Sequence, residues 1–244
     1  MSAVHAQRFQ VRFDECGPDG SARSSTILRY VVETAFGHSA AVGYPLSWYF
    51  AQGLFWVVRQ AHLSLALPIG YADALEVTTQ VLGARRVWAR RGNTVRNGAG
   101  VAVGAATMDW ILTGRDGRPA RIPREMTAAF SVIPGTALER YAAETPPVGA
   151  RTGAYRVPAH QTDPRGHMNN AAYLDLLDDA LAALGLDPQT RPAEYDLAYL
   201  QPALSGDTLQ YAAWATPAGA NVAVHRPDGS PVWWGRRRRP AAAP

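Results

Sequence analysis

Two stretches of the chain repeat apolar side chains at the three- and four-residue spacing of an amphipathic helix. The first covers residues 27–42 and the second residues 171–184. In the second stretch, Leu174, Leu177 and Leu181 share one face, whereas Asp175, Asp178 and Asp179 occupy the other. The pattern predicts two helices, each with a buried face.

Runs typical of strands follow each predicted helix, because they combine alternation with Val, Ile, Thr or Trp and end at turn residues. The first set covers residues 54–67, 74–82, 87–96 and 101–113, and the second covers 194–201, 208–216, 221–225 and 232–235. An alternating run at residues 155–160 also precedes the second helix and indicates the end of a strand. One helix followed by antiparallel strands, twice, predicts an α+β fold of two similar halves.

A weak internal repeat supports the two halves. An offset of 146 residues places Gly20 on Gly166 and Val11 on Val157. Further on, residues 68–73 resemble residues 202–207 at an offset of 134, so the first half carries extra residues near 43–53. The predicted organisation is a first half at 1–133, a Pro/Gly-containing linker at 134–152, a second half at 153–235 and a basic disordered tail at 236–244.

Composition excludes several classes of protein. No apolar run approaches the ~20 residues of a membrane span, and residues 1–10 lack the apolar core of a signal peptide. The single cysteine, Cys16, excludes an intrachain disulfide framework and fits a reducing compartment. We therefore expect a cytoplasmic protein that does not enter a membrane.

All 24 basic residues are arginine, and the formal net charge is +4. Four arginines form the run Arg236–Arg239, so the rest of the chain is nearly neutral and does not indicate nucleic-acid binding. No His, Cys or carboxylate cluster has metal-ligand spacing, and no glycine-rich cofactor motif occurs. We predict neither a metal nor a cofactor.

A short polar loop leads directly into the second helix. It reads Asp163-Pro164-Arg165-Gly166-His167-Met168-Asn169-Asn170. Asp-Pro-x-Gly is a common turn and either asparagine is a natural helix N-cap, so the loop has a purely structural interpretation. The functional interpretation is a carboxylate beside a helix N-terminus, whose free N–H groups favour negative charge.

The string D-x-x-G-H-M-N-N-x-x-Y, which ends at Tyr173, resembles the signature of hot-dog-fold thioesterases. Residues 33–43, 54–59 and 109–125 also resemble segments of the acyl-ACP thioesterases of plant plastids and their bacterial relatives. The resemblance covers nearly the whole chain. It implies a double hot-dog fold, in which a curved antiparallel sheet wraps a helix in each half, and hydrolysis of a fatty or polyketide acyl thioester on acyl carrier protein or coenzyme A.

The resemblance also implies roles for the loop. Asp163 would activate water or attack the thioester, and N–H groups around Gly166 to Met168 and the helix start would stabilise the oxyanion. His167 would orient the carboxylate or the water, or else only cap the loop. Asn169 and Asn170 match the asparagine pair that opens the family's helix.

Two departures from the family pattern matter. Arg165 replaces the loop asparagine, and no acid, base or nucleophile occurs at residues 201–203, where the family has its later acidic or cysteine residue. Arg165 would keep Asp163 ionised, bind a pantetheine phosphate or point to solvent. In the first half, Gly17 stands at the position of Asp163 and Ser21 at that of His167, so that half lacks the catalytic groups.

Aromatic residues are the candidates for acyl contact. Tyr173, Phe55 and Trp56 are predicted to touch substrate, and Phe36, Trp48 and Phe50 either line an acyl tunnel or belong to the core. His38 and His62 are expected to be packing residues.

Arginine clusters are the candidates for binding the acidic acyl carrier protein. They are the run 236–239, alternatively a solvated end, and the group Arg85, Arg86, Arg90 and Arg91. The chain is expected to be a monomer or a homodimer.

Two rival functions remain. A hot-dog dehydratase or hydratase would use His167 with a carboxylate, and a non-catalytic acyl- or carrier-binding protein would need neither.

Overall fold

The computed structural model describes residues 4–130, 141 and 143–239. Part of the predicted linker, at 134–140 and 142, and the last five residues of the predicted tail lie outside the described residues. Residues 143–150 of the linker hold no helix or strand, whereas its last two residues belong to a strand that begins at Arg151.

The first half contains five strands and three helices in the order β1, α1, α2, β2, β3, β4, β5, α3. Their bounds are β1 Val4–Gln10, α1 Ser24–Ala41, α2 Leu46–Gln52, β2 Phe55–Leu65, β3 Ala74–Arg85, β4 Trp88–Asn97, β5 Ala102–Thr113 and α3 Arg124–Ala129. The second half contains β6 Arg151–Arg156, α4 Ala172–Ala183, β7 Ala193–Tyr199, β8 Thr208–Thr216, β9 Gly219–His225 and β10 Pro231–Arg238. Single 3-10 turns at Phe13–Glu15 and Ala159–Gln161 precede α1 and α4.

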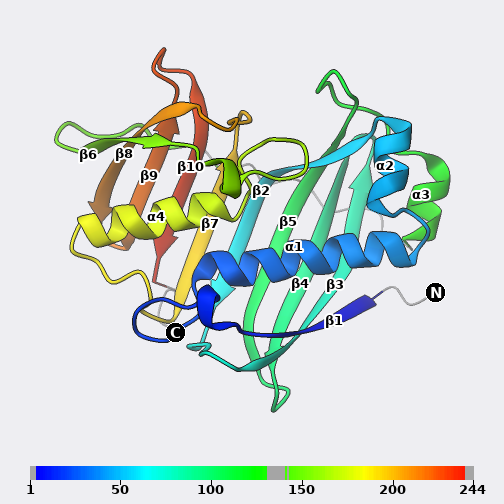
Figure 1. Cartoon of the computed structure of the whole chain (residues 1–244), viewed down its shortest axis with the longest axis horizontal. Helices are drawn as coiled ribbons and strands as arrows, with labels where there is room; N and C mark the ends of the chain where they lie inside the picture. Colours follow the sequence, from blue (N-terminus) through cyan, green and yellow to red (C-terminus); the bar gives the residue numbers. More distant parts are fainter. Residues whose placement is uncertain (1–3, 131–140, 142, 240–244) are drawn as a thin grey trace.

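All ten strands form one antiparallel sheet in the order β1-β3-β4-β5-β2-β7-β10-β9-β8-β6 (Figure 1). The two halves of the sheet have the same connectivity when each is read from its outer edge inward. The first half reads β1, β3, β4, β5, β2, and the second half reads β6, β8, β9, β10, β7. The halves join where β2 pairs with β7, from Gln60 opposite Ala198 to Leu65 opposite Ala193.

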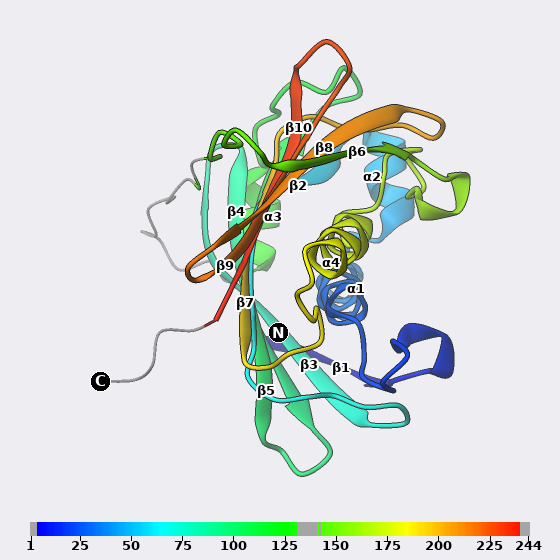
Figure 2. The same cartoon turned by 90° about the vertical axis from the view of Figure 1, so that its left-hand side faces the viewer.

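Helices α1 and α4 both lie on one face of the sheet, called the helix face below, and they meet near their N-terminal ends (Figure 1, Figure 2). Ile27, Leu28 and Val31 of α1 are fully buried, as are Leu174 and Leu177 of α4. These side chains belong to one apolar core that both halves share. Burial of a leucine or isoleucine side chain stabilises the fold by ~1.5–3 kcal/mol. The arrangement is the predicted double hot-dog.

Hydrogen bonds confirm the internal repeat at the two loops that precede α1 and α4. Gly17 N donates to Ser21 O at 2.8 Å, and Asp163 N donates to His167 O at 2.7 Å. Gly20 and Gly166 both have φ near +79°, a conformation that residues with a Cβ atom rarely adopt. The two loops therefore have the same backbone turn, and only the second carries a carboxylate at its first position.

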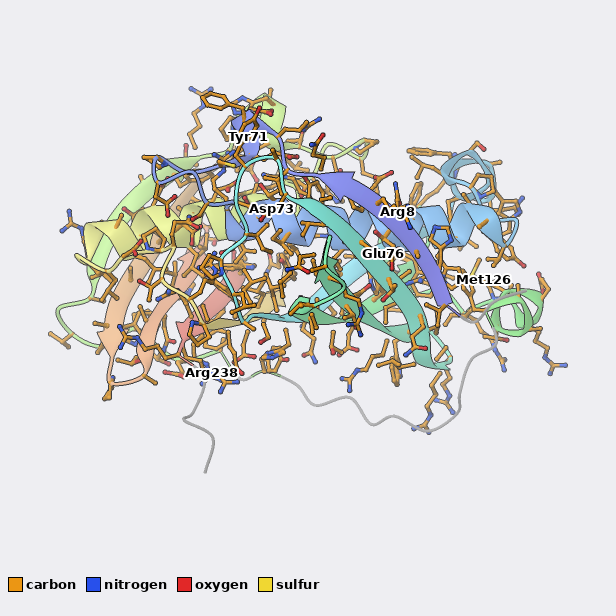
Figure 3. The ribbon with its side chains drawn as sticks, turned by 90° about the horizontal axis from the view of Figure 1, so that it is seen from below. Arg8, Tyr71, Asp73, Glu76, Met126 and Arg238 are labelled. Atoms are coloured by element: carbon orange, nitrogen blue, oxygen red, sulfur yellow. The ribbon has the colours of Figure 1, made fainter. Side chains whose placement is uncertain are left out.

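Three elements of the first half were not predicted. Strand β1 covers an edge of the sheet, where Arg8 lies 3.5 Å from Glu76 on β3 (Figure 3). Helix α2 occupies the extra residues near 43–53, and α3 follows β5. Both helices are short, with 7 and 6 residues, so neither repeats its apolar spacing often enough to give a periodic signal.

The prediction of a tail from residue 236 is wrong for Arg236 to Arg238. Strand β10 continues to Arg238, where it pairs with both β7 and β9. Arg236 Nη2 lies 2.6 Å from Asp196 Oδ2, and Arg237 is buried. Carboxylates on β7 pair with Arg236 and Arg238, and Arg237 donates a hydrogen bond to Thr190 O. The charge run gave no sign of these partners. Within the described ranges, no helix is long and apolar enough to cross a membrane.

The prediction that Asp178 lies on the polar face of its helix is wrong, because this carboxylate of α4 is buried. Neither of its oxygens accepts a hydrogen bond from any described residue. Burial raises the pKa of Asp178 to about 8, because it penalises the charged form. The folded protein therefore holds Asp178 protonated at neutral pH, whereas the unfolded chain ionises it near pH 4.

We expect Asp178→Asn to raise the melting temperature at pH 8 by roughly 5–10 °C and to change it little at pH 4. Between pH 4 and pH 8 the unfolded wild type loses the Asp178 proton, whereas the folded wild type keeps it. The free energy of unfolding of the wild type therefore falls as pH rises. Asp179→Asn, on the exposed side of the same helix, is the control and should have a much smaller effect. A wild-type stability that does not fall over this pH range relative to Asp178→Asn would contradict the prediction.

Candidate active site

The Asp163 loop borders a cleft of about 500 Å³ at the junction of the two halves. Residues of α1, α2, β2 and β5 form the opposite wall, so both halves contribute. The lining residues from the loop and the helix start are Asp163, Pro164, Arg165, Asn169 and Asn170.

The Asp163 carboxylate is half-buried and held by the loop itself. Its Oδ1 accepts hydrogen bonds from the Arg165 N–H at 2.9 Å and from the His167 N–H at 3.1 Å. Among the described residues, no donor binds Oδ2. One oxygen thus positions the carboxylate, and the other is available to a molecule in the cleft.

The predicted oxyanion donors are already used by the protein. The N–H of Gly166 donates to Asp163 O and that of Met168 to Ala203 O, while that of His167 donates to Asp163 Oδ1. This part of the prediction is therefore wrong, because these N–H groups close the turn. In the described structure the N–H of Asn170 has no acceptor, and Asn170 lines the cleft.

His167 contributes its backbone, not its ring. Its N–H orients Asp163, but its side chain is absent from the cleft wall. Burial, together with the neighbouring Arg165, lowers the pKa of His167, and Asp163 offsets this only in part. The imidazole is therefore neutral at pH 7.

Arg165 does not point to solvent. Its guanidinium carbon lies 4.4 Å from the centre of the Phe55 ring on β2. Burial lowers the pKa of Arg165, which Asp163 partly restores. This cation–π contact connects the loop of the second half to the first half.

Tyr173 and Met168 lie in the core, so the predicted substrate contact of Tyr173 is wrong. Tyr173 is 3% exposed, and its ring stacks on Trp233 of β10 with centroids 5.3 Å apart. Met168 is 4% exposed. The first turn of α4 points Tyr173 at the sheet, away from the cleft.

Comparison with known proteins gives the family. Residues 2–130, more than half of the chain, match the acyl-ACP thioesterase N-terminal domain. This chain belongs to the acyl-ACP thioesterase family. Asp163 lies outside the matched segment.

A palmitoyl-acyl carrier protein thioesterase of Arabidopsis thaliana chloroplasts is 28% identical over 131 residues, which cover 50% of this chain and 32% of the relative. The match therefore spans about a third of the curated relative's length.

Solved structures show the same fold. A candidate oleoyl thioesterase from Lactobacillus plantarum superposes with a TM-score of 0.85 at 20% identity, covering 96% of both chains. The 12:0-ACP thioesterase of Umbellularia californica gives a TM-score of 0.82 at 19% identity, covering 98% of this chain and 97% of the other. The double hot-dog fold thus extends over both halves.

The cleft of this acyl-ACP thioesterase family member has an aromatic wall. The predicted residues Phe36, Phe50, Phe55 and Trp56 line it, together with Trp110 of β5. Trp48 does not, because it packs edge-on against Tyr44 and Tyr49. Phe55 and Trp56 thus line the cleft, and their contact with substrate stays a prediction.

Polar lining residues on α1 were missed. Arg29 and Glu33 lie on the same stripe of α1 as Phe36 and Ala40, at helical spacing. Arg29 Nη2 lies 2.8 Å from Asp175 Oδ2, so it links α1 to α4. The three- and four-residue spacing of these lining residues along the predicted helix at 27–42 is the sequence signal that could have identified them. Glu33 is the second carboxylate of the cleft.

The expected patch of Arg85, Arg86, Arg90 and Arg91 does not form. Arg85 and Arg86 are exposed at the end of β3, whereas Arg90 binds Asp109 on the outer face of the sheet and Arg91 is buried on the helix face. Successive residues of a strand point to opposite faces, so adjacent arginines separate.

His62 is also not a plain packing residue, because its Nδ1 lies 2.8 Å from Asp196 Oδ1 across the junction of the halves.

We expect Arg165 and Phe55 to be energetically coupled. In a double-mutant cycle with Arg165→Met and Phe55→Leu, the two losses of unfolding free energy in urea should differ from additivity by about 1 kcal/mol. Arg165→Met combined with Phe13→Leu, a ring exposed beside the other loop, should be additive. Additivity in both cycles would contradict the contact.

Proposed function

We propose that this protein hydrolyses an acyl thioester carried by acyl carrier protein, or less efficiently by coenzyme A, in the cleft at Asp163. The observation that carries the proposal is the Asp163 carboxylate, which lines a cleft with an aromatic wall, has Oδ1 fixed by two backbone N–H groups and has no hydrogen-bond donor on Oδ2 among the described residues. Membership of the acyl-ACP thioesterase family supports the reaction and the carrier.

Asp163 Oδ2 would act on the thioester carbonyl carbon in one of two ways. It would take a proton from a water molecule that attacks this carbon, or it would attack the carbon itself and give a mixed anhydride that water then opens. Either route releases a free acid and a thiol.

The oxyanion would be stabilised at the start of α4. The Asn170 N–H and the side-chain amide of Asn170 are donors without an acceptor in the described structure. Asn169, which also lines the cleft, accepts the Ala171 N–H through its Oδ1, so its side-chain N–H groups would be further donors. These donors replace the Gly166 to Met168 groups of the sequence prediction.

The acyl chain would extend along the aromatic wall on α1 and β2. Since that wall belongs to the first half, the half without a catalytic loop would bind the acyl group. Arg236 and Arg238 do not support carrier binding, because carboxylates of β7 already pair with them.

The main rival is a dehydratase with the same fold. Such an enzyme needs a base at the acyl carbons, and the ring of His167 does not reach the cleft. Product analysis separates the two: hydrolysis yields a free acid and a thiol, whereas dehydration yields an enoyl thioester with no free thiol.

We predict that Asp163→Asn lowers kcat for thiol release by about 10³-fold, because it removes the base or nucleophile and keeps the size of the side chain. Thiol release from a panel of acyl carrier protein and coenzyme A thioesters measures the effect.

Asp19→Asn in the equivalent loop of the first half is the matched control and should retain full activity. Equal rates in wild type and Asp163→Asn would remove Asp163 from the mechanism. A wild type that binds acyl carrier protein but hydrolyses no thioester would favour the non-catalytic alternative.

A further inference from the structure

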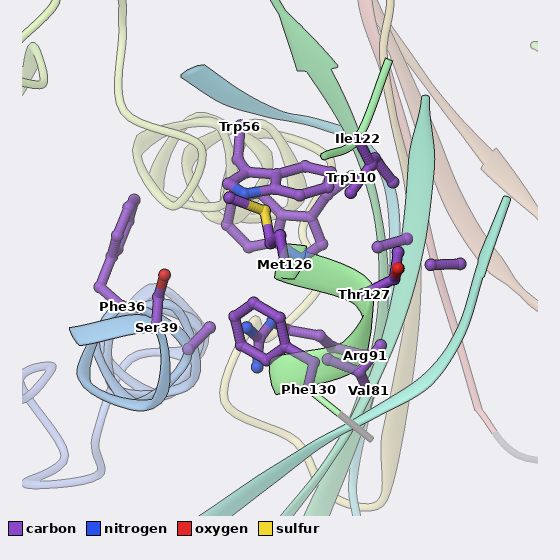
Figure 4. Close-up of a pocket in the computed structure, with 13 residues that line it drawn as sticks. Phe36, Ser39, Trp56, Val81, Arg91, Trp110, Ile122, Met126, Thr127 and Phe130 are labelled. Carbon is purple, nitrogen blue, oxygen red and sulfur yellow. The ribbon is translucent and has the colours of Figure 1, made fainter. Parts of the chain in front are cut away.

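A second, smaller cavity lies beside the cleft, within the first half, and shares three lining residues with it. It has a volume of about 40 Å³, roughly three times the space that one water molecule needs. It lies between α1, α3 and the helix face of β3, β4 and β5 (Figure 4). Phe36, Trp56 and Trp110 border both spaces, so we call this cavity the end chamber of the cleft.

The walls of the end chamber are almost entirely apolar. Val81, Ile122, Met126 and Phe130 line it together with the shared aromatic residues. Such walls suit the far end of an acyl chain. The charged residue among them, Arg91, does not fit this description.

Arg91 is 8% exposed and enters the chamber from β4 (Figure 4). Its guanidinium carbon lies 5.1 Å from the centre of the Phe130 ring, and Nη1 lies 3.0 Å from His38 Nδ1. No carboxylate among the described residues pairs with it. By contrast, the next residue, Arg90, binds both oxygens of Asp109.

His38 cannot neutralise Arg91. Burial and the charge of Arg91 lower the pKa of His38 to about 4, so its ring is neutral and accepts through Nδ1. Burial lowers the pKa of Arg91 to about 10, which still leaves it charged at pH 7. A buried cation with one neutral partner is costly, and an anion or a strong acceptor in the chamber would offset that cost.

We propose that the end chamber selects acyl groups whose far end carries an oxygen acceptor, a carboxylate or a ketone, which binds the guanidinium of Arg91. The proposal rests on the proposed thioester hydrolysis and specifies its substrate class. Arg91 presents N–H donors in a fixed fork that suits a carboxylate. A methyl end would leave these donors without an acceptor, and a site built to hydrogen-bond rejects an analogue that lacks the partner.

The test compares three acyl thioesters of equal chain length that end in a methyl group, a ketone or a carboxylate. We expect wild type to show at least a tenfold higher kcat/KM for one of the oxygenated ends than for the methyl end. Arg91→Met should abolish this preference, because Met fills the space of the arginine stem without its donors. Arg96→Met, an exposed position on the same strand, should keep it.

Wild type alone can overturn the proposal: equal or better hydrolysis of the methyl-ended substrate would show that Arg91 only packs on Phe130. A preference that survives in Arg91→Met would do the same. If Arg91→Met does not fold, Arg91→Lys serves instead, and it should reduce the preference because it loses the fork and keeps the charge.

Binding separates this proposal from the proposed reaction. Calorimetry with non-hydrolysable amide analogues of the three substrates measures binding without reaction. We expect the oxygenated analogues to bind more tightly than the methyl-ended analogue, even if the protein hydrolyses none of the three thioesters. Tight binding of the oxygenated analogues without turnover would reject the hydrolysis and keep the chamber's preference. Turnover with no difference between the ends would reject the preference and keep the hydrolysis.

Discussion

The pairing of β2 with β7 is the constraint on which the rest of the structure depends. It joins two five-stranded halves into one sheet and places α1 and α4 on the same face, where their N-terminal ends meet (Figure 1). Across this joint, Asp196 binds His62 of the other half and Arg236 of its own. Burial alone would raise the pKa of Asp196, but these two hydrogen-bonding partners outweigh it and hold the pKa at about 2. The joint therefore keeps its charge pair over the ordinary pH range.

The cleft is a product of this joint. Neither half encloses it alone, because the carboxylate loop belongs to the second half and the aromatic wall to the first. The contact of Arg165 with Phe55 connects the two sides. The equivalent loop of the first half keeps the turn, with Gly17 in place of the aspartate. In the proposed function, one half would provide the reacting group and the other the binding surface, which would explain why a duplicated fold has one candidate active site here.

Sheet geometry also distributes the charges of the molecule. On β4, Arg90 reaches the outer face and finds Asp109, whereas Arg91 reaches the helix face and lies in an apolar chamber. On β10, Arg236 and Arg238 meet carboxylates of the neighbouring strand β7. The arginines of this chain therefore act as buried or paired groups at several positions where the sequence showed only clusters of positive charge.

The sequence by itself determined the helices at residues 27–42 and 171–184, most of the strands, the two-fold repeat and the Asp163 loop. These features are local, since apolar periodicity and turn residues report on neighbours along the chain. Tertiary structure alone decided which N–H groups of the loop are free, that Tyr173 packs on Trp233, and that Arg237 is buried. It also decided the partners of Arg90, Arg91 and Arg236, which lie on other strands or helices. A partner that is distant in the sequence leaves no trace in the spacing of residues, and only the pairing of strands and the packing of helices brings it into contact.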